Sequence, residues 1–257
     1  LYNINDIEIS VDINLDPSGT NFVFIHGLQS RKEAFSYIIK KLKEKYSIPY
    51  ISIDLVGFGN SEKKLDFNYD LLDQVLIIDR LLDHLKIKKI IIVGHSFGGM
   101  IGTKLLENRK LDVSAFINLE GNLCLDDCGE SINVANMNYL DFLPYYDSLK
   151  SRLLNSKTFA ETFRGGSLDL IPPKVFFKTS QTIVKWSKNN KLNEIFENTA
   201  IPKLLIRGDK SNFKSYPQNV KITHSSIAGG THFMILERPN QTYEAIHDYL
   251  FGNKLLG

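Results

Sequence analysis

Short apolar runs alternate with amphipathic stretches along the first half of the chain. The runs are rich in Ile, Val, Phe and Leu, which is typical of strands buried on both faces of a sheet. They occupy residues 22–27 (FVFIHG), 50–55 (YISIDL), 90–94 (IIIVG) and 115–120 (AFINLE). Between them, apolar residues recur at helical spacing over 35–46 and 71–85, and residues 98–107 also favour a helix. The alternation predicts an α/β fold with a mostly parallel sheet, covered by helices on both faces, whose sites lie at the carboxyl ends of the strands.

The alternation stops after residue 120. Residues 121–198 are rich in Leu, Phe and Tyr, contain three prolines and favour helices over buried strands. The strand pattern resumes at 201–209 (IPKLLIRGD) and 220–230 (VKITHSSIAGG), and a last helix is expected from Pro239, which suits the first position of a helix. We therefore expect one core built from residues 1–120 and 199–257, with a helical insertion at residues 121–198 before the last two strands.

Composition narrows the classes of function. The 257 residues are 43% hydrophobic and 23% charged, as in ordinary globular domains, and the formal net charge is only +2. Lysines occur in short, scattered clusters without a continuous basic stripe, so we expect no nucleic-acid partner. No apolar run approaches the ~18 residues of a membrane span, and no secretory signal is visible.

The cysteine content favours a reducing compartment. The chain has only Cys124 and Cys128, with no second pair of ligands and no histidine nearby. Two reduced thiols are therefore expected rather than a metal site. We predict a cytoplasmic protein without metal or cofactor.

The run at 90–94 leads directly into GHSFGG, which contains the pattern Gly94-x-Ser96-x-Gly98. This pattern is typical of a sharp turn between a buried strand and a helix, on which a serine nucleophile is exposed. The start of the following helix would also favour negative charge developing near the serine. The alternative is a glycine-rich turn in which Ser96 is only a small structural residue.

A serine hydroxyl is a weak nucleophile unless a base lies beside it. Among the six histidines, His232 follows the last predicted strand and precedes the last helix, in GGTHFMILERP, from where it could reach Ser96 across the sheet edge. His95 flanks the serine and is expected to pack or hydrogen-bond locally. The remaining candidates, His84, His224 and His247, lie at ordinary helix or strand positions.

Taken together, these segments resemble the α/β-hydrolase superfamily. FIHG resembles its oxyanion loop, DLVGFGNSEK its turn after the next strand, GHSFGG its nucleophile elbow and GGTHFMILERP its histidine loop. The resemblance runs from residue 22 to residue 250 and puts the helical insertion in the position of the family's cap. It implies Ser96 as nucleophile and His232 as base, with the backbone N–H groups of Leu28 and Phe97 as the oxyanion hole. His26 would then shape the first loop.

The acid of the triad departs from the family pattern. The family usually supplies it after the strand KLLIRG, but that loop here reads GDKSN, with Ser211 in the usual place and Asn212 next to it. Neither can carry the negative charge that stabilises a histidinium. Glu120 ends the run AFINLE at the same sheet edge, where some relatives, notably dehalogenases, place a glutamate. We favour Glu120, with Asp209 as the alternative acid; a third alternative is no acid, with Glu120 turned to solvent.

The cap is expected to define an apolar pocket over the strand ends. Its candidate lining residues are aromatic, and most of them are expected to form the cap's own core: Tyr139, Phe142, Tyr145, Phe163 and Trp186, with Tyr146, Phe176 and Phe177 as further candidates. Arg164 is expected either in a flexible cap loop or bound to a substrate carboxylate.

The leading prediction is a serine hydrolase that cleaves a small, largely apolar ester or thioester through an acyl-enzyme. The same triad would also support acyl transfer, lyase chemistry or C–C bond cleavage, and a ligand receptor on a hydrolase scaffold is a further alternative. Halide-releasing and epoxide-opening relatives use aspartate at the elbow, so Ser96 disfavours those reactions. The sequence leaves open the acyl group, the leaving group and the oligomeric state.

Overall fold

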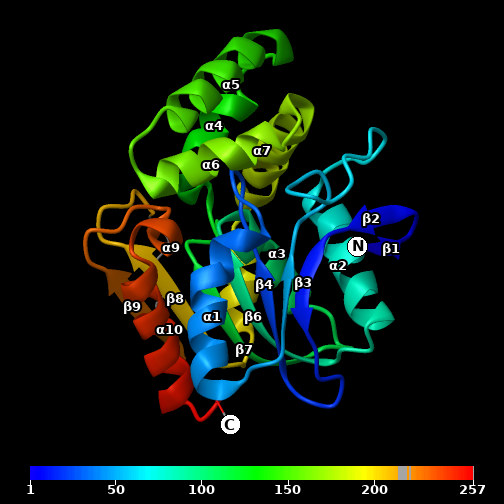
Figure 1. Cartoon of the computed structure of the whole chain (residues 1–257), viewed down its shortest axis with the longest axis vertical. Helices are drawn as coiled ribbons and strands as arrows, with labels where there is room; N and C mark the ends of the chain where they lie inside the picture. Colours follow the sequence, from blue (N-terminus) through cyan, green and yellow to red (C-terminus); the bar gives the residue numbers. More distant parts are fainter. Residues whose placement is uncertain (214–218, 220, 257) are drawn as a thin grey trace.

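The computed structural model describes residues 1–213, 219 and 221–256, and its centre is a sheet (Figure 1). In chain order the strands are β1 (Tyr2–Ile4), β2 (Ile7–Ile9), β3 (Val11–Asn14), β4 (Asn21–Ile25), β5 (Tyr50–Ile53), β6 (Lys89–His95), β7 (Asp112–Leu119), β8 (Lys203–Gly208) and β9 (Ile222–Ile227). Within the described residues, seven of them form the central sheet in the order β3-β5-β4-β6-β7-β8-β9. Only the edge pair β3–β5 is antiparallel.

Both faces of the central strands are buried. Successive side chains of a strand point to opposite faces, so Val23 and Ile25 of β4 pack into one layer while Phe22 and Phe24 pack into the other. Strands buried in this way have no polar face, which explains the continuous apolar runs. The structure confirms the predicted mostly parallel α/β fold.

Helices cover the sheet on both sides (Figure 1). Besides the 3₁₀ helices η1 (Lys32–Phe35) and η2 (Leu125–Asp127), they are α1 (Ser36–Tyr46), α2 (Leu71–His84), α3 (Phe97–Leu105), α4 (Glu130–Ala135), α5 (Tyr139–Leu154), α6 (Phe159–Asp169), α7 (Pro173–Ser187), α8 (Lys191–Asn198), α9 (Met234–Glu237) and α10 (Pro239–Gly252). One face packs against α1 and α10, and the other packs against α2, α3 and α8. As predicted, Pro239 is the first residue of the last helix.

The N-terminal strands were not among the predicted elements. β1 and β2 form a separate antiparallel pair, and β3 forms the antiparallel edge of the main sheet. In β2, Ile7 and Ile9 are buried while Glu8 is exposed. This alternation predicts a half-buried strand. Continuous apolar runs reveal only strands buried on both faces, so this edge was missed.

Helices α4 to α7 form a cap above the sheet, and the chain enters it after β7 and leaves it before β8 (Figure 1). Helix α8 differs from the expected boundary of the insertion, because it packs on the sheet. Its Phe196 is fully buried, and its ring centroid lies 5.6 Å from that of Phe116 on β7. The apolar face of α8 packs beside the sheet, so α7 is the last helix of the cap.

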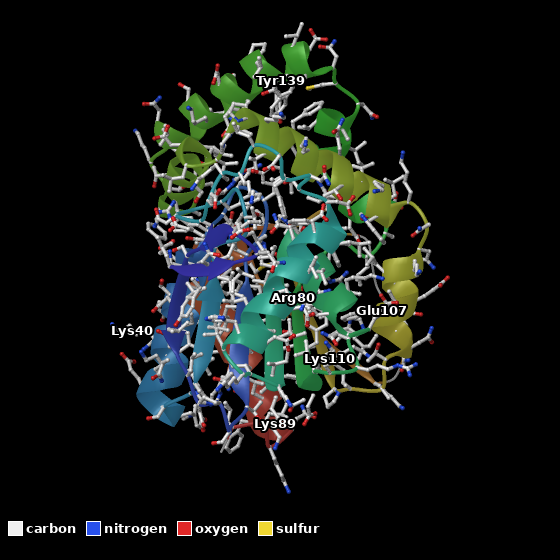
Figure 2. The ribbon with its side chains drawn as sticks, turned by 90° about the vertical axis from the view of Figure 1, so that its right-hand side faces the viewer. Lys40, Arg80, Lys89, Glu107, Lys110 and Tyr139 are labelled. Carbon is white, nitrogen blue, oxygen red and sulfur yellow. The ribbon has the colours of Figure 1, made fainter. Side chains whose placement is uncertain are left out.

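Charged side chains lie on the outer surface of the core. Figure 2 shows Lys40, Arg80, Lys89 and Lys110 directed away from the sheet, and all four are exposed. The lysines thus lie on separate elements. In the part of the chain that the structure describes, no helix is long and apolar enough to cross a membrane.

Candidate active site

Ser96 sits on a sharp turn between β6 and α3. Its backbone has φ 53° and ψ −120°, a strained conformation for a residue with a side chain. Glycine is required two residues before Ser96 and two residues after it. A Cβ on Gly98 would lie 2.0 Å from the carbonyl oxygen of Ile25, and a Cβ on Gly94 would lie 2.5 Å from that of Gly98. The close packing of α3 against β4 therefore explains the pattern Gly-x-Ser-x-Gly and holds the serine at the carboxyl edge of the sheet.

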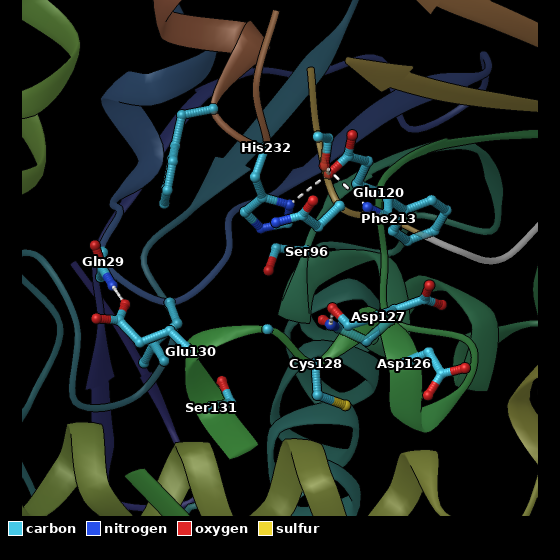
Figure 3. A pocket seen from close by; sticks show the side chains of 16 residues that line it. Gln29, Ser96, Glu120, Asp126, Asp127, Cys128, Glu130, Ser131, Phe213 and His232 are labelled. Carbon is cyan, nitrogen blue, oxygen red and sulfur yellow. Dashed lines mark hydrogen bonds and ion pairs between the residues drawn. The ribbon is translucent and has the colours of Figure 1, made fainter. Parts of the chain in front are cut away.

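His232 and Glu120 form a hydrogen-bonded pair at the same edge. The Nδ1 of His232, in the loop between β9 and α9, lies 2.7 Å from Oε2 of Glu120. Glu120 directly follows β7, its side chain is fully buried, and its backbone has φ 47°. A second strained residue thus lies at the site, and its carboxylate points toward the imidazole (Figure 3).

The Glu120 carboxylate also accepts two hydrogen bonds from the turn after β8. The Gly208 N–H donates to Oε1 at 2.8 Å, and the Ser211 hydroxyl donates to Oε2 at 2.7 Å. A buried carboxylate is costly unless donors compensate for its lost hydration. Ser211, at the family's usual position for the acid, therefore stabilises an acid that comes from a different strand.

Asp209 is not brought to His232. Its Oδ1 accepts the Gly229 N–H at 2.8 Å, and the residue is exposed. The side chain therefore holds the turn after β9. Of the two carboxylates considered for the triad, the structure brings only Glu120 to the histidine.

Ser96 and His232 line the same cavity. In Figure 3 the serine lies next to the imidazole, and its hydroxyl points away from the ring. No hydrogen bond joins the two side chains among the described residues. Such bonds often form only when substrate is bound. The arrangement provides a serine, an imidazole and a carboxylate in the order required for nucleophilic catalysis.

The loop after β4 lies against Ser96. A Cβ on Gly27 would be 2.6 Å from the Cβ of Ser96, so glycine allows this backbone to lie close to the serine. The amides of Leu28 and Phe97 donate no backbone hydrogen bond within the described residues. Two unused N–H groups beside a serine can stabilise a developing oxyanion.

His26 fixes that loop from within. Its Nδ1 lies 2.8 Å from the Gly27 carbonyl oxygen, and its Nε2 accepts the Leu55 N–H at 3.1 Å. The ring therefore carries its proton on Nδ1. Complete burial lowers the pKa of His26, which keeps the ring neutral. The histidine joins the loop after β4 to the segment that follows β5, which is a structural role.

His95, beside Ser96, is hydrogen-bonded to the loop that carries His232. Its Nε2 donates to the carbonyl oxygen of His232 at 2.8 Å, and the two ring centroids are 5.0 Å apart. Burial, with the neighbouring charge of His232, lowers the pKa of His95 to about 3. His95 is therefore a neutral donor that joins the strand before Ser96 to the loop that carries His232.

A cavity of about 230 Å³ opens over Ser96, Glu120 and His232. More of its surface is apolar than polar, with Leu28, Phe213 and Phe233 among the lining residues. Besides the serine, glutamate and histidine, its polar lining includes Gln29, Asn122, Asp126, Asp127, Glu130 and Ser131. No lysine or arginine of the described residues lines it. The carboxylate of Asp127 accepts hydrogen bonds from the backbone N–H groups of Leu123 and Cys124, so it stabilises the backbone of its own loop. No group of three or more His, Cys, Asp or Glu in the described chain is placed to hold a metal.

Comparison with known proteins identifies the family. A family model described as the alpha/beta hydrolase fold matches residues 20–219, most of the chain. The chain belongs to the alpha/beta hydrolase fold family.

Individual relatives in this family are distant. An uncharacterized hydrolase, YugF, of Bacillus subtilis is 32% identical over 100 residues, which are 39% of this chain and 36% of that protein. Ethanol acetyltransferase 1 of Kluyveromyces lactis is 32% identical over 80 residues, or 31% of this chain and 21% of that protein. The aligned part thus spans about a third or less of these relatives. An esterase from Exiguobacterium antarcticum superposes with a TM-score of 0.75 at 19% identity, covering 96% of this chain and 97% of that one, which shows the shared fold.

The aromatic residues expected to line the hydrolase pocket do not reach the cavity. Tyr139 lies on α5 near the outer end of the cap (Figure 2). Phe142 is fully buried. Its ring packs against four further candidates: Tyr145, Tyr146, Phe176 and Phe177. These side chains build the cap's own core because the cap helices must bury apolar faces against one another.

Phe163 and Trp186 are engaged elsewhere. The guanidinium of Arg31 lies 4.2 Å from the centre of the Phe163 ring, and the indole N–H of Trp186 donates to Asp70 at 3.0 Å. Both contacts join the cap to the core away from Ser96. Polar residues of η2 and α4 line the cavity instead.

Sequence reasoning did not single out Gln29. It lies next to a candidate oxyanion residue, has φ 61° and is almost completely buried. A positive φ at a residue other than glycine leaves no reliable mark in a single sequence. Arg164, expected in a flexible loop or on a substrate carboxylate, lies within α6 and donates to Gln29 Oε1.

Proposed function

We propose that the protein is a serine hydrolase that cleaves a small ester or thioester through an acyl-enzyme. The observation that carries the proposal is the Glu120–His232 pair beside Ser96 in one cavity. The family and the strained elbow support it, because this turn is the usual platform for a serine nucleophile in such enzymes. The names of the hydrolase and esterase relatives agree with it.

In the proposed reaction, Ser96 Oγ attacks the carbonyl carbon and its proton passes to Nε2 of His232. Glu120 holds the Nδ1–H tautomer and stabilises the imidazolium. The amides of Leu28 and Phe97 donate to the oxyanion. The tetrahedral intermediate then expels the alcohol or thiol, which takes the proton from His232. Water, deprotonated by the same histidine, attacks the acyl carbon and releases the acid and free Ser96.

The cavity favours a short acyl group. Its volume of about 230 Å³ is below the roughly 300–1,000 Å³ of pockets for drug-sized ligands. Its wall has more apolar than polar surface, with Leu28, Phe213 and Phe233 among the lining residues, which suits the small, largely apolar substrate that the sequence favours. Because carboxylates line the wall and no lysine or arginine of the described residues does, a neutral substrate suits it better than an anionic one.

The test combines covalent labelling with a substrate series. A fluorophosphonate should label the wild type at Ser96, and the Ser96→Ala variant should stay unlabelled while keeping its fold. Across p-nitrophenyl esters from acetate to laurate, kcat/KM should be greatest for the shortest acyl chains and fall by about 10⁴-fold or more in Ser96→Ala. Labelling or turnover that survives this substitution would exclude the proposal.

A second candidate is acyl transfer to an alcohol. The similarity to an ethanol acetyltransferase favours it, since the acyl-enzyme would be the same and only the acceptor would differ. Product analysis in mixtures of water and ethanol separates the two. A transferase would form ethyl ester well above the ethanol mole fraction, whereas a hydrolase would form mainly the free acid. The products also distinguish lyase or C–C bond cleavage.

A further inference from the structure

One side chain links the loop of the candidate oxyanion hole to the cap. Gln29 directly follows Leu28, is only 3% exposed and has φ 61°. Its amide uses both of its ends. The oxygen accepts from Arg164 on α6, and the nitrogen donates to Glu130 on α4 (Figure 3). A strained backbone persists only where surrounding contacts determine it, and these contacts come from the cap.

The contact with Arg164 is bidentate. Nε and Nη2 of the guanidinium donate to Gln29 Oε1 at 3.1 and 2.6 Å. The same guanidinium lies 3.8 Å from the ring centre of Phe233, the residue after the proposed base. Arg164 therefore touches the oxyanion loop through Gln29 and the base loop through Phe233.

Glu130 extends the network to a third cap helix. One of its carboxylate oxygens accepts from Gln29, and the other accepts from the hydroxyl of Tyr145 on α5. Burial, together with this hydrogen bond, raises the pKa of Tyr145, so the hydroxyl stays a donor at neutral pH. The side-chain amide of Gln29 is thus connected to α4 and α6 directly, and to α5 through Glu130.

We propose that Gln29 is a positioning residue that couples the docked cap to the oxyanion hole. This inference rests on the proposed function, because it concerns the placement of the Leu28 N–H. The amide of Gln29 suits a place between a cation and an anion, since it accepts from the guanidinium and donates to the carboxylate. Undocking of the cap would release the loop and displace the Leu28 amide from the developing oxyanion.

The charges suggest a pair of compensating substitutions. Gln29→Glu keeps the acceptor for Arg164 but sets a carboxylate against Glu130, which is repulsive in a buried site. Adding Glu130→Gln restores every partner, because an amide at position 130 can donate to a carboxylate at position 29 and still accept from the Tyr145 hydroxyl. The double variant therefore exchanges the positions of acid and amide within the same network.

The experiment measures kcat, KM, fluorophosphonate labelling rate and Tm for the wild type and these variants. We expect Gln29→Glu to lower kcat and the labelling rate by about 10- to 100-fold, with KM within about threefold, because only the transition state uses the oxyanion hole. The double variant, which carries Gln29→Glu and Glu130→Gln together, should recover to within about threefold of the wild type. Lys150→Met removes a cap residue outside the network and should leave kcat unchanged.

Two outcomes would overturn the inference. A raised KM with unchanged kcat would make Gln29 a substrate contact, and failure of Glu130→Gln to rescue Gln29→Glu would break the proposed coupling. Tm supplies a test that needs no activity: Gln29→Glu should lower it and the double variant should restore it. Wild-type protein that neither hydrolyses esters nor reacts with fluorophosphonate would refute the proposed function, and the Tm comparison would still decide whether the network couples cap and loop.

Discussion

The turn after β7 and the turn after β8 lie side by side at the carboxyl edge of the sheet, but they contribute differently to the site. The β7 turn provides the carboxylate of Glu120, whereas the β8 turn, where the family usually has its acid, provides the hydrogen-bond donors Gly208 and Ser211. The loop with His232 leaves β9 and must pass over β8 and β7 to reach Ser96 after β6. A carboxylate that follows β7 or β8 can therefore lie beside Nδ1 of His232. From this difference we expect the acid of the triad to be defined by its place beside the imidazole and not by its place in the chain.

The largest effect is expected from removing the charge on the β7 turn. Glu120→Gln should lower kcat by about 10² to 10⁴-fold, because His232 loses control of its tautomer and the partner of its positive charge. KM should change little. Steady-state kinetics on a short p-nitrophenyl ester measures both, and near wild-type kcat would show that the carboxylate has no catalytic role.

Returning the acid to the β8 turn should recover part of this loss. When Ser211→Asp is added to Glu120→Gln, we expect kcat to rise about tenfold or more above Glu120→Gln alone, because the Ser211 hydroxyl and the His232 imidazole already share Glu120 Oε2. Ser211→Asp alone should be impaired, since two carboxylates would then share one buried site. A double variant no better than Glu120→Gln would mean that the β8 turn cannot present an acid to Nδ1.

Removing the donor from the β8 turn should have a moderate effect. Ser211→Ala leaves Glu120 with the Gly208 N–H and His232 as partners. The loss of one hydrogen bond of about 1 kcal/mol predicts a fall in kcat of roughly 3- to 10-fold. Ser211→Thr keeps the hydroxyl and serves as the matched control, so equal losses in both variants would point to altered packing.

The smallest effect is expected at Asp209. Asp209→Asn should keep kcat within about twofold of the wild type, because an exposed side chain whose hydrogen bond goes to the Gly229 N–H contributes little. The same kinetic assay, run beside Glu120→Gln, makes this the direct comparison of the two carboxylates. Inactivation by Asp209→Asn with an active Glu120→Gln would reverse the assignment.

The aromatic residues of the cap show what composition alone leaves open. Most of them fill the cap's own core, as expected, while the cavity is lined by residues of η2 and α4 together with residues of the core such as Leu28 and Phe233. Apolar content indicates that a segment buries surface, and it does not indicate against what. Helix α8 gave the same lesson, since its amphipathic pattern fitted a cap helix as well as a helix packed on the sheet.

The sequence by itself determined the elements whose physical basis is local. The apolar runs specify buried strands, the glycines around Ser96 mark the sharp turn on which it sits, and Pro239 starts the last helix. Tertiary structure alone decided which carboxylate faces the base, because Glu120 and His232 are 112 residues apart in the chain. It also decided that Gln29 joins the oxyanion loop to the cap through Arg164, 135 residues away. Such contacts depend on where strand ends and helices meet in space, and no local pattern of hydrophobic and polar residues encodes that meeting.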